Sequence, residues 1–163
     1  MTVKEQPTPH TKGIKNCLKK VDFKDTFSTT NHTNSLEEVA RLVFDKMPPW
    51  IERLMNLRNY LVKFMGLKTQ IPEDYHPRYE VGGYIGFFKI YAIYADEIIM
   101  GADDKHLNFR ASIYDSQEKA FNIKVSTLVE YNRMMGRIYM FFVKPFHRLV
   151  VKRMVRQASE DRS

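Results

Sequence analysis

The feature that most constrains the fold is the alternation of apolar and polar residues over residues 85–131. Side chains at successive positions of a β-strand point to opposite faces of a sheet, so this pattern predicts strands with one apolar and one polar face. Two short polar turns interrupt it, Asp103-Asp104-Lys105 and Ser116-Gln117-Glu118. Connections this short join antiparallel neighbours. Four strands are predicted, at residues 85–94, 97–102, 106–115 and 120–131.

A long amphipathic helix is predicted after the sheet, from Met134 to about Gln157. The apolar residues that share one of its faces are Ile138, Phe142, Phe146, Leu149 and Val150. The basic residues on another face are Arg137, Lys144, Arg148, Lys152 and Arg156. Pro145 should kink the helix, because proline removes a backbone hydrogen bond. A half-apolar antiparallel sheet followed by such a helix favours an α+β fold of the helix-grip kind, in which the sheet wraps around the C-terminal helix and leaves a cavity beside it.

The residues before the sheet predict one short strand and two helices. The strand is indicated by alternation at Val21, Phe23, Asp25 and Phe27. Ser35 and Glu38 form a capping-box signature for a helix that Pro48-Pro49 ends. A second amphipathic helix is marked by Trp50, Leu54, Leu57, Leu61 and Met65, which gives a helix–kink–helix unit. Residues 68–83, rich in proline, glycine and tyrosine, predict a long loop that could form a lid or rim.

The chain is long enough for one domain with a buried core. Residues 1–20 lack apolar periodicity and predict a flexible lead or an irregular wrap, residues 21–158 a single domain, and residues 159–163 a frayed tail. The net charge of +7 is concentrated at both ends: residues 1–24 hold six lysines against two acidic residues, and residues 133–163 hold eight basic residues against two acidic ones. Such ends can attract nucleic acid or anionic lipid, but they also suit a solvated helix face and a soluble tail. We expect the second, and therefore expect neither nucleic acid nor a membrane surface as a partner.

Cys17 is the sole cysteine, so the chain cannot form an internal disulfide. Together with an N-terminus that does not resemble a secretion signal, this favours a cytoplasmic protein. Lysine neighbours would lower the thiol pKa somewhat, but we interpret Cys17 as an incidental thiol. No histidine stands at metal-ligand spacing from it, so neither a metal nor a cofactor is predicted. No apolar run approaches the roughly 20 residues that a membrane span needs.

Two motifs carry a family resemblance. The strand motif contains Asp104, His106, Leu107, Phe109, Arg110 and Ser112. The helix motif contains Gly136, Arg137, Tyr139, Pro145, Phe146, His147 and Arg148. With these motifs the chain resembles, over residues 21–158, the bacterial domain-of-unknown-function family 2867, although Asn108 stands where that family often has an acidic residue. The resemblance implies a START/polyketide-cyclase-like (SRPBCC) fold with a ligand cavity and no established reaction.

The residues His106, Asn108 and Arg110 recur at period two and should project from the polar face of their strand, away from the core. Ser112 and Tyr114 follow on the same face. A cationic group, an imidazole and small hydroxyls on one face could bind an anion or carry acid–base chemistry. We favour a structural interpretation, in which Arg110 pairs with a carboxylate across the sheet. The alternative is a polar interface, for instance to a second subunit.

His147 also has two interpretations. Its ring could satisfy a backbone carbonyl freed by Pro145, which we favour, or it could reach into the cavity beside Arg137 and Tyr139. Candidate residues of the cavity or its rim are Trp50, Tyr91, Arg137, Tyr139, Phe142, Phe146 and His147. No catalytic residue is assigned, because no nucleophile triad, carboxylate pair or metal motif is recognised.

The function that best fits these patterns is binding of a small apolar or amphipathic ligand between the sheet and the C-terminal helix. One alternative is a protein-interaction module or homodimer without a ligand, built on the basic helix or the polar sheet face. Another is a cyclase- or dehydratase-like enzyme, which would need polar side chains that converge inside the cavity.

Overall fold

The computed structural model of this chain describes residues 2–46, 48–63 and 73–160. Within this part, seven strands form one antiparallel sheet in the order β1-β2-β7-β6-β5-β4-β3. The strands are β1 (Lys4–Glu5), β2 (Phe23–Thr29), β3 (Tyr84–Ile85), β4 (Phe88–Ile93), β5 (Glu97–Asp103), β6 (Leu107–Asp115) and β7 (Ile123–Tyr131). The helices are α1 (Lys12–Asn16), α2 (Leu36–Phe44), α3 (Pro49–Lys63) and α4 (Met134–Arg156). The α+β class predicted from the sequence is confirmed.

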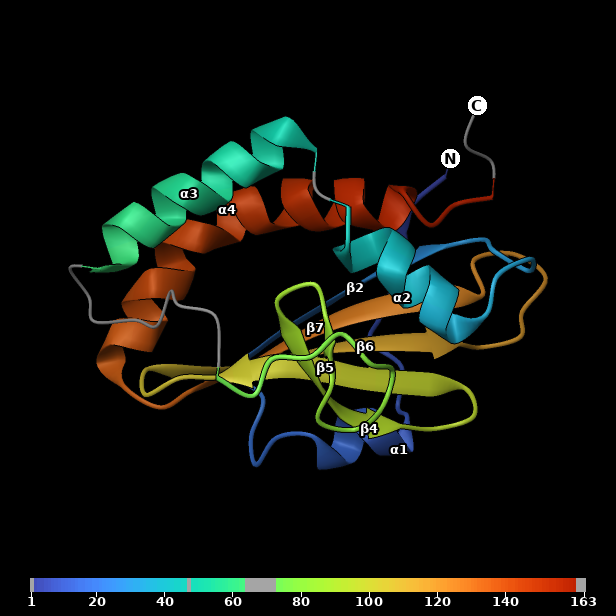
Figure 1. Ribbon diagram of the computed structural model, residues 1–163, viewed down its shortest axis with the longest axis horizontal. Coiled ribbons are helices and arrows are strands. Elements are labelled where there is room, and N and C mark those ends of the chain that lie inside the picture. The colour runs from blue at the N-terminus through green and yellow to red at the C-terminus, as the bar shows by residue number, and fades with distance from the viewer. Residues whose placement is uncertain (1, 47, 64–72, 161–163) are drawn as a thin grey trace.

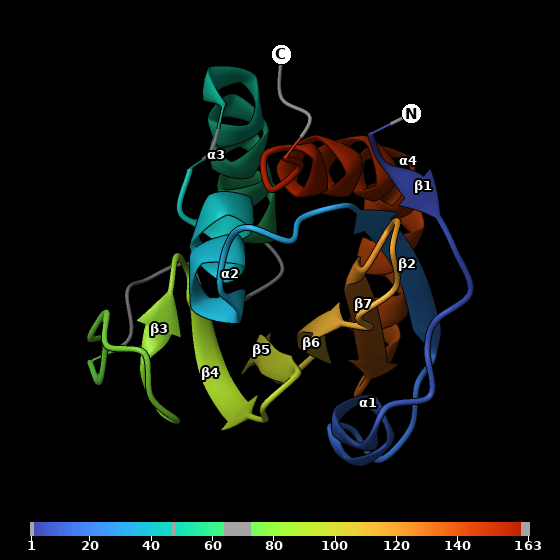
Figure 2. The same ribbon diagram turned by 90° about the vertical axis from the view of Figure 1, so that its right-hand side faces the viewer.

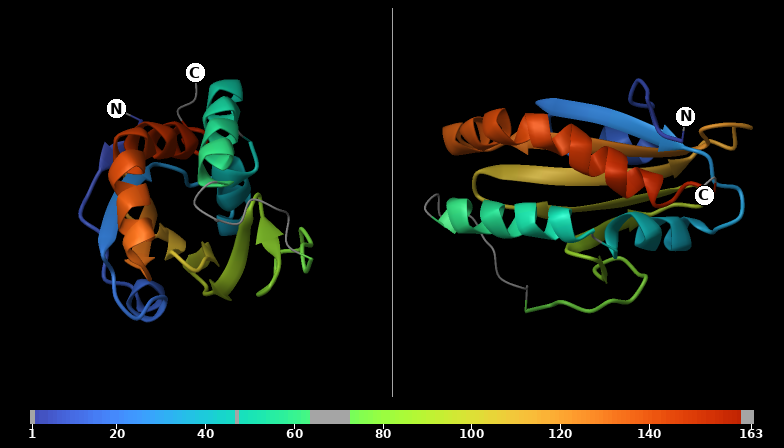
Figure 3. Two further views of the ribbon diagram at one scale, coloured as in Figure 1. Left: turned by 90° about the vertical axis from the view of Figure 1, so that its left-hand side faces the viewer. Right: turned by 90° about the horizontal axis from the view of Figure 1, so that it is seen from above.

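The period-two pattern located the central strands well, since β5, β6 and β7 each begin and end within three residues of the prediction. The segment predicted as one strand at residues 85–94 is instead divided into β3 and β4. Gly86 causes the division, because its φ of +60° turns the chain and its N–H donates to the Asp45 carboxylate rather than to a neighbouring strand. The sheet curves, and α2, α3 and α4 all lie on its concave side (Figure 2, Figure 3).

The core lies between the apolar side of the sheet, α2 and the C-terminal end of α4. The predicted capping box starts α2: the Ser35 hydroxyl accepts the N–H of Glu38, whose carboxylate accepts the N–H of Ser35. This start directs Val39 and Val43 onto the sheet. Fully buried core residues from the sheet and α4 include Phe27, Met100, Ile113 and Val155. Buried apolar area of this kind is the main stabilising contribution to a domain of this size.

The helix α4 crosses the concave side, but it turns toward the sheet a different face from the one the sequence suggested. Its buried residues are Gly136, Met140, Met154 and Val155. Four of the five residues of the predicted apolar face are instead 42–67% exposed, namely Ile138, Phe142, Phe146 and Leu149. Pro145 lies inside the helix, which changes direction along its length (Figure 1). Periodicity predicts which residues share a face; it cannot tell which of two apolar faces contacts the sheet.

The polar side of the sheet is covered by the chain's own N-terminal segment, whereas the sequence pattern predicted that it faces outward. β1 pairs with β2 and forms one edge of the sheet, and α1 lies under the sheet, on the side away from α4 (Figure 1). The hydroxyls of Thr11 and Ser112 both donate to the buried carboxylate of Glu97, at 2.7 and 2.5 Å. A polar sheet face can be buried when its groups find partners in this way. The sequence left a flexible lead and an irregular wrap open for residues 1–20, because a cover held by side-chain hydrogen bonds leaves no apolar period in the sequence.

Candidate functional site

The closed core ends at a row of aromatic rings near the β5–β6 turn. Ala102, Leu107 and Phe109 lie on the apolar side of the sheet, yet Ala102 is exposed and the other two are half-buried. The ring of Phe109 contacts that of Phe88, and Phe88 contacts Phe44 of α2, with ring centroids 5.1 and 5.3 Å apart. Beyond this row the apolar surface reaches solvent. Phe88, Ala102, Leu107 and Phe109 are named the apolar floor below.

The first turn of α4 is fixed directly beside this floor by the β5–β6 turn. The His106 carbonyl accepts the N–H of Asn132, and the Asn132 amide donates to the Asp104 carbonyl. A side chain on Gly136 would collide with the His106 carbonyl and press against Leu107. Asp104, His106 and Gly136, three of the motif residues, therefore form a structural joint between the sheet and α4.

Further along α4, the His147 imidazole faces the sheet and contacts Asp25 of β2. Nε2 lies 3.1 Å from Asp25 Oδ2, and the two side chains are 14% and 8% exposed. The Phe23 ring packs edge-on against the imidazole, with centroids 5.6 Å apart. His147 thus contacts a carboxylate rather than a carbonyl freed by Pro145. A sheltered imidazole–carboxylate pair can exchange a proton or hydrogen-bond with a polar group brought against it.

The residues Arg110 and Tyr91 lie on the other side of the sheet, under the N-terminal segment. Arg110 forms an ion pair with Asp103 of the neighbouring strand at 2.7 Å, as the structural interpretation of the sequence predicted. Its guanidinium stacks 3.8 Å from the centroid of the Tyr91 ring. Burial raises the pKa of the Tyr91 hydroxyl, and Arg110 opposes the shift. Tyr91 therefore does not share a cavity with the residues of α4.

The thiol of Cys17 lies in the same covered region and donates to the Ile14 carbonyl at 3.3 Å. Burial raises its pKa, which the positive charge of Arg110 only partly offsets. The sequence suggested a pKa lowered by neighbouring lysines. The shift runs the other way because the sheet shelters the sulfur from water.

The two arginines of the helix motif serve partners on the rim of the sheet. Arg148 holds Glu5 of β1 through two hydrogen bonds of 2.7 and 2.8 Å. Arg137 is exposed, and its guanidinium lies 5.4 Å from the centroid of the Tyr131 ring. Arg137 and His147 are thus engaged with different residues, so these two groups do not form one acid–base site.

A model of the family described as "Protein of unknown function (DUF2867)" matches residues 17–154. The chain belongs to this family. The match runs from the end of α1 to the last turn of α4, so the DUF2867 region includes the apolar floor, the joint and the His147–Asp25 pair. A search of the curated proteins and a search of the solved structures found no match.

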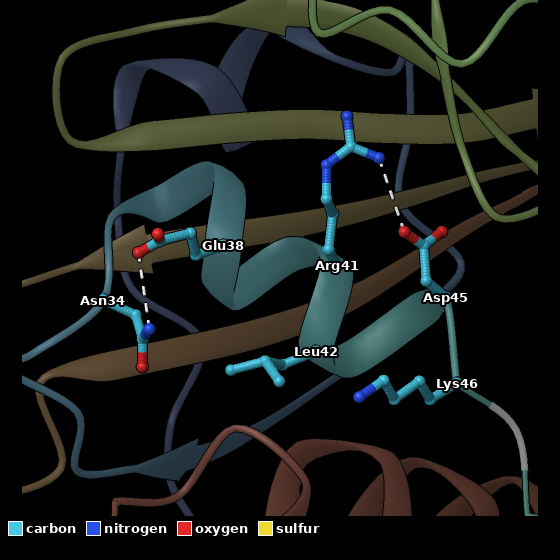
Figure 4. Close-up of a pocket in the computed structure, with 6 residues that line it drawn as sticks. All are labelled: Asn34, Glu38, Arg41, Leu42, Asp45 and Lys46. Carbon is cyan, nitrogen blue, oxygen red and sulfur yellow. Dashed lines mark hydrogen bonds and ion pairs between the residues drawn. The ribbon is translucent and has the colours of Figure 1, made fainter.

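In the described part of this DUF2867 protein, no helix is both long and apolar enough to cross a bilayer. Over the same residues, no group of three His, Cys, Asp or Glu side chains is arranged to hold a metal ion. A surface depression on α2 is lined by Asn34, Glu38, Arg41, Leu42, Asp45 and Lys46 (Figure 4). Four of its polar groups contact one another: Arg41 forms an ion pair with Asp45 at 3.4 Å, and the Asn34 amide donates to the Glu38 carboxylate at 3.3 Å. These are contacts within and next to one helix, so the functional site of the DUF2867 domain is not assigned there.

The remaining predicted site residues are dispersed. Trp50 of α3, Phe142 and Phe146 are 42–67% exposed, whereas Tyr139 is half-buried beside the joint. The first part of the predicted loop, residues 68–72, lies outside the described residues; its second part is held to β4 by the ion pair of Asp74 with Lys89. The sequence did not point to a functional role for Ala102 or Asp25, although both lie in predicted strands. Ala102 sits at an ordinary strand position. Asp25 interrupts the apolar face that Phe23 and Phe27 form, but only the fold brings it against His147 of α4.

Proposed function

We propose that this DUF2867 domain binds a small apolar or amphipathic molecule between the concave side of the sheet and α4. The apolar floor carries the proposal: a central-strand alanine is exposed, and two large apolar neighbours are only half-buried. In a filled core these positions would be closed to water. Tyr139 and Val143, half-buried on α4 one and two turns after Gly136, would form the opposite wall.

The His147–Asp25 pair could hydrogen-bond with a polar end of such a ligand. In the register of the sheet, Asp25 lies opposite Thr127 on β7, and the next row on the same face runs Phe23, Val129, Phe109, Ala102. Two strand spacings separate β2 from β6, which is about 10 Å. A molecule of that length with one polar end could therefore contact both the floor and the pair. This arrangement also suits the helix-grip fold, which remains part of the proposal.

The two alternatives have less support. Arg137 and His147 have separate partners, which weakens the case for a cyclase- or dehydratase-like reaction. The polar sheet face lies under the N-terminal segment, so a dimer through Arg110 would first need that segment displaced.

The substitution Ala102→Trp tests the proposal, because it fills the floor from an exposed position without disturbing a buried residue. The full chain is titrated with the uncharged probe 1-N-phenylnaphthylamine, whose fluorescence rises in apolar surroundings. We expect the wild type to bind the probe and Ala102→Trp to bind it at least about tenfold more weakly, since an indole would occupy the space. Ala95→Trp, at the exposed β4–β5 turn, is the matched control and should bind like the wild type. Equal binding by all three proteins would contradict the proposed site.

A further inference from the structure

The outer side of α4 carries a row of apolar residues that the rest of the described fold leaves exposed. Its residues recur at helical spacing and are 42–73% exposed: Met134, Ile138, Phe141, Phe142, Phe146 and Leu149. These six are named the α4 ridge. Isolated exposed apolar residues are common on proteins, but a row of six along one helix, three of them phenylalanine, marks a surface that meets another apolar phase.

Basic residues accompany the ridge along the whole helix. The sequence of α4 contains six lysines and arginines and no aspartate or glutamate. Lys144 and Lys152 lie over the rings of Phe23 and Phe27 of β2, at 5.2 and 5.9 Å, which places them on the flank of α4 nearest that strand. Arg148, on the same flank, is already paired with Glu5. The other five basic residues of α4 form no ion pair with a carboxylate of the described residues, so they can meet an external negative charge.

We propose that α4 docks the protein on the surface of an anionic lipid bilayer. An apolar helix face rich in phenylalanine and leucine, with Lys and Arg beside it, is the arrangement by which helices lie in the interface of such membranes. Each cation adds attraction to an anionic surface. The proposal departs from the expectation from sequence, which interpreted the basic ends as a solvated helix face and a soluble tail and took no account of an exposed apolar face beside them.

The charge distribution selects the bilayer over a second copy of the chain. A symmetric dimer through the ridge would bring α4 against α4 and so place two sets of basic residues next to each other, with no carboxylate on either helix to offset them. The three phenylalanine rings of the ridge are more than half exposed, so a protein partner would need a groove to receive them, whereas a bilayer deforms around them. The helix α3 runs beside α4 on the same outer side of the molecule (Figure 1, Figure 3). Its Trp50 and Tyr60 are 42% and 62% exposed, and such residues favour the boundary between water and lipid.

The test is sedimentation of the full chain with large unilamellar vesicles, of phosphatidylcholine alone or with phosphatidylglycerol as about one lipid in three. We expect binding to the anionic vesicles, weak binding to the neutral ones, and release by high salt because exposed charges are screened. Trp50, the only tryptophan, should show a blue shift on binding.

The double variant Phe141→Ser/Phe142→Ser should bind at least about tenfold more weakly, because two rings no longer enter the lipid. Phe87→Ser is the matched control, since Phe87 is 65% exposed at the β3–β4 turn and lies outside the ridge. Lys152→Gln/Arg153→Gln should lose the preference for anionic vesicles, whereas Lys12→Gln/Lys15→Gln on the opposite side should keep it.

Three results would overturn the proposal: no binding to anionic vesicles at low salt, equal binding by the ridge variant and the wild type, or a solution dimer that the ridge variant dissociates. The ridge variant leaves the apolar floor intact. Its failure to bind vesicles while it still binds 1-N-phenylnaphthylamine would therefore separate this proposal from the proposed function.

Discussion

The two faces of α4 allow a direct prediction about stability. Replacing a large residue on the exposed outer face by alanine should lower the free energy of unfolding less than replacing a smaller residue on the buried inner face. Phe142 is 67% exposed, whereas Met140, two residues earlier, is 4% exposed against the sheet. The perturbations are the single substitutions Phe142→Ala and Met140→Ala. Both keep the residue helical and both remove apolar side-chain atoms.

The magnitudes follow from how much of each side chain is buried. Full burial of a phenylalanine contributes about 1.5–3 kcal/mol, so the buried third of Phe142 accounts for about 0.5–1 kcal/mol. Alanine is the better helix former by up to about 0.7 kcal/mol, which offsets most of that loss. Phe142→Ala should thus lower the free energy of unfolding by less than about 1 kcal/mol. Met140→Ala leaves a cavity in a closed contact and should cost about 2–5 kcal/mol.

Urea denaturation followed by circular dichroism measures both values, provided the transition is two-state and its slope is unchanged. The reasoning is refuted if Phe142→Ala costs as much as Met140→Ala. That result would mean that the ridge is buried in solution, either against α3 or in a dimer, and it would remove the physical basis for membrane docking.

Three further predictions concern the covered polar face and the joint. Burial raises the pKa of the Cys17 thiol in the folded state, so as pH rises the thiol of the unfolded chain loses its proton first. The free energy of unfolding is therefore unaffected by this group below the usual thiol pKa of about 8.5 and falls as pH rises beyond it. Cys17→Ser should remove that part of the alkaline loss, which unfolding curves at neutral and alkaline pH would detect. Glu97→Leu leaves the buried Ser112 hydroxyl without its acceptor and should cost about 1–3 kcal/mol, whereas Glu97→Gln, which keeps an acceptor, should cost less than about 1 kcal/mol. A Glu97→Leu variant as stable as wild type would show that these hydrogen bonds contribute nothing net. Gly136→Ala should destabilise by about 1–3 kcal/mol although alanine favours helices, because its Cβ would strike the His106 carbonyl; a more stable variant by thermal unfolding would disprove that contact.

The strands and α2 were predictable because their signals are local. Alternation over residues 97–131 reflects one buried face per strand, and the Ser35–Glu38 capping box is a contact between residues three apart. The pairing of Arg110 with Asp103 was also within reach, since it joins neighbouring strands across one short turn.

The candidate site was less predictable because its parts meet only in three dimensions. His147 and Asp25 are far apart in the sequence. Asp25 stands out as a carboxylate between Phe23 and Phe27 on the apolar face of its strand, but nothing in the sequence shows which residue it contacts. Ala102 looks like any small strand residue, and its exposure depends on where α2 stops covering the sheet. The α4 ridge shows most clearly what residue spacing cannot predict. Spacing places Ile138, Phe142 and Phe146 on one face of the helix. Only the burial of Gly136 and Met140 shows that this face points away from the sheet.

The polar face of the sheet is a second case in which residue spacing did not predict burial. Ser112 was expected to face solvent, because polar residues alternate with apolar ones in its strand. Its acceptor Glu97 lies on the neighbouring strand, on the same face of the sheet. They are buried because Thr11 and the residues around it supply hydrogen bonds, and such a cover leaves no trace in hydrophobic periodicity.

We propose that a small apolar or amphipathic molecule occupies the concave side of the sheet over the apolar floor. Native mass spectrometry of the full chain, purified without detergent or organic solvent, tests it most directly. The account predicts a discrete added mass that organic extraction removes and that Ala102→Trp does not carry. The bare mass of the chain in every wild-type preparation, or the same added mass on Ala102→Trp, would contradict it.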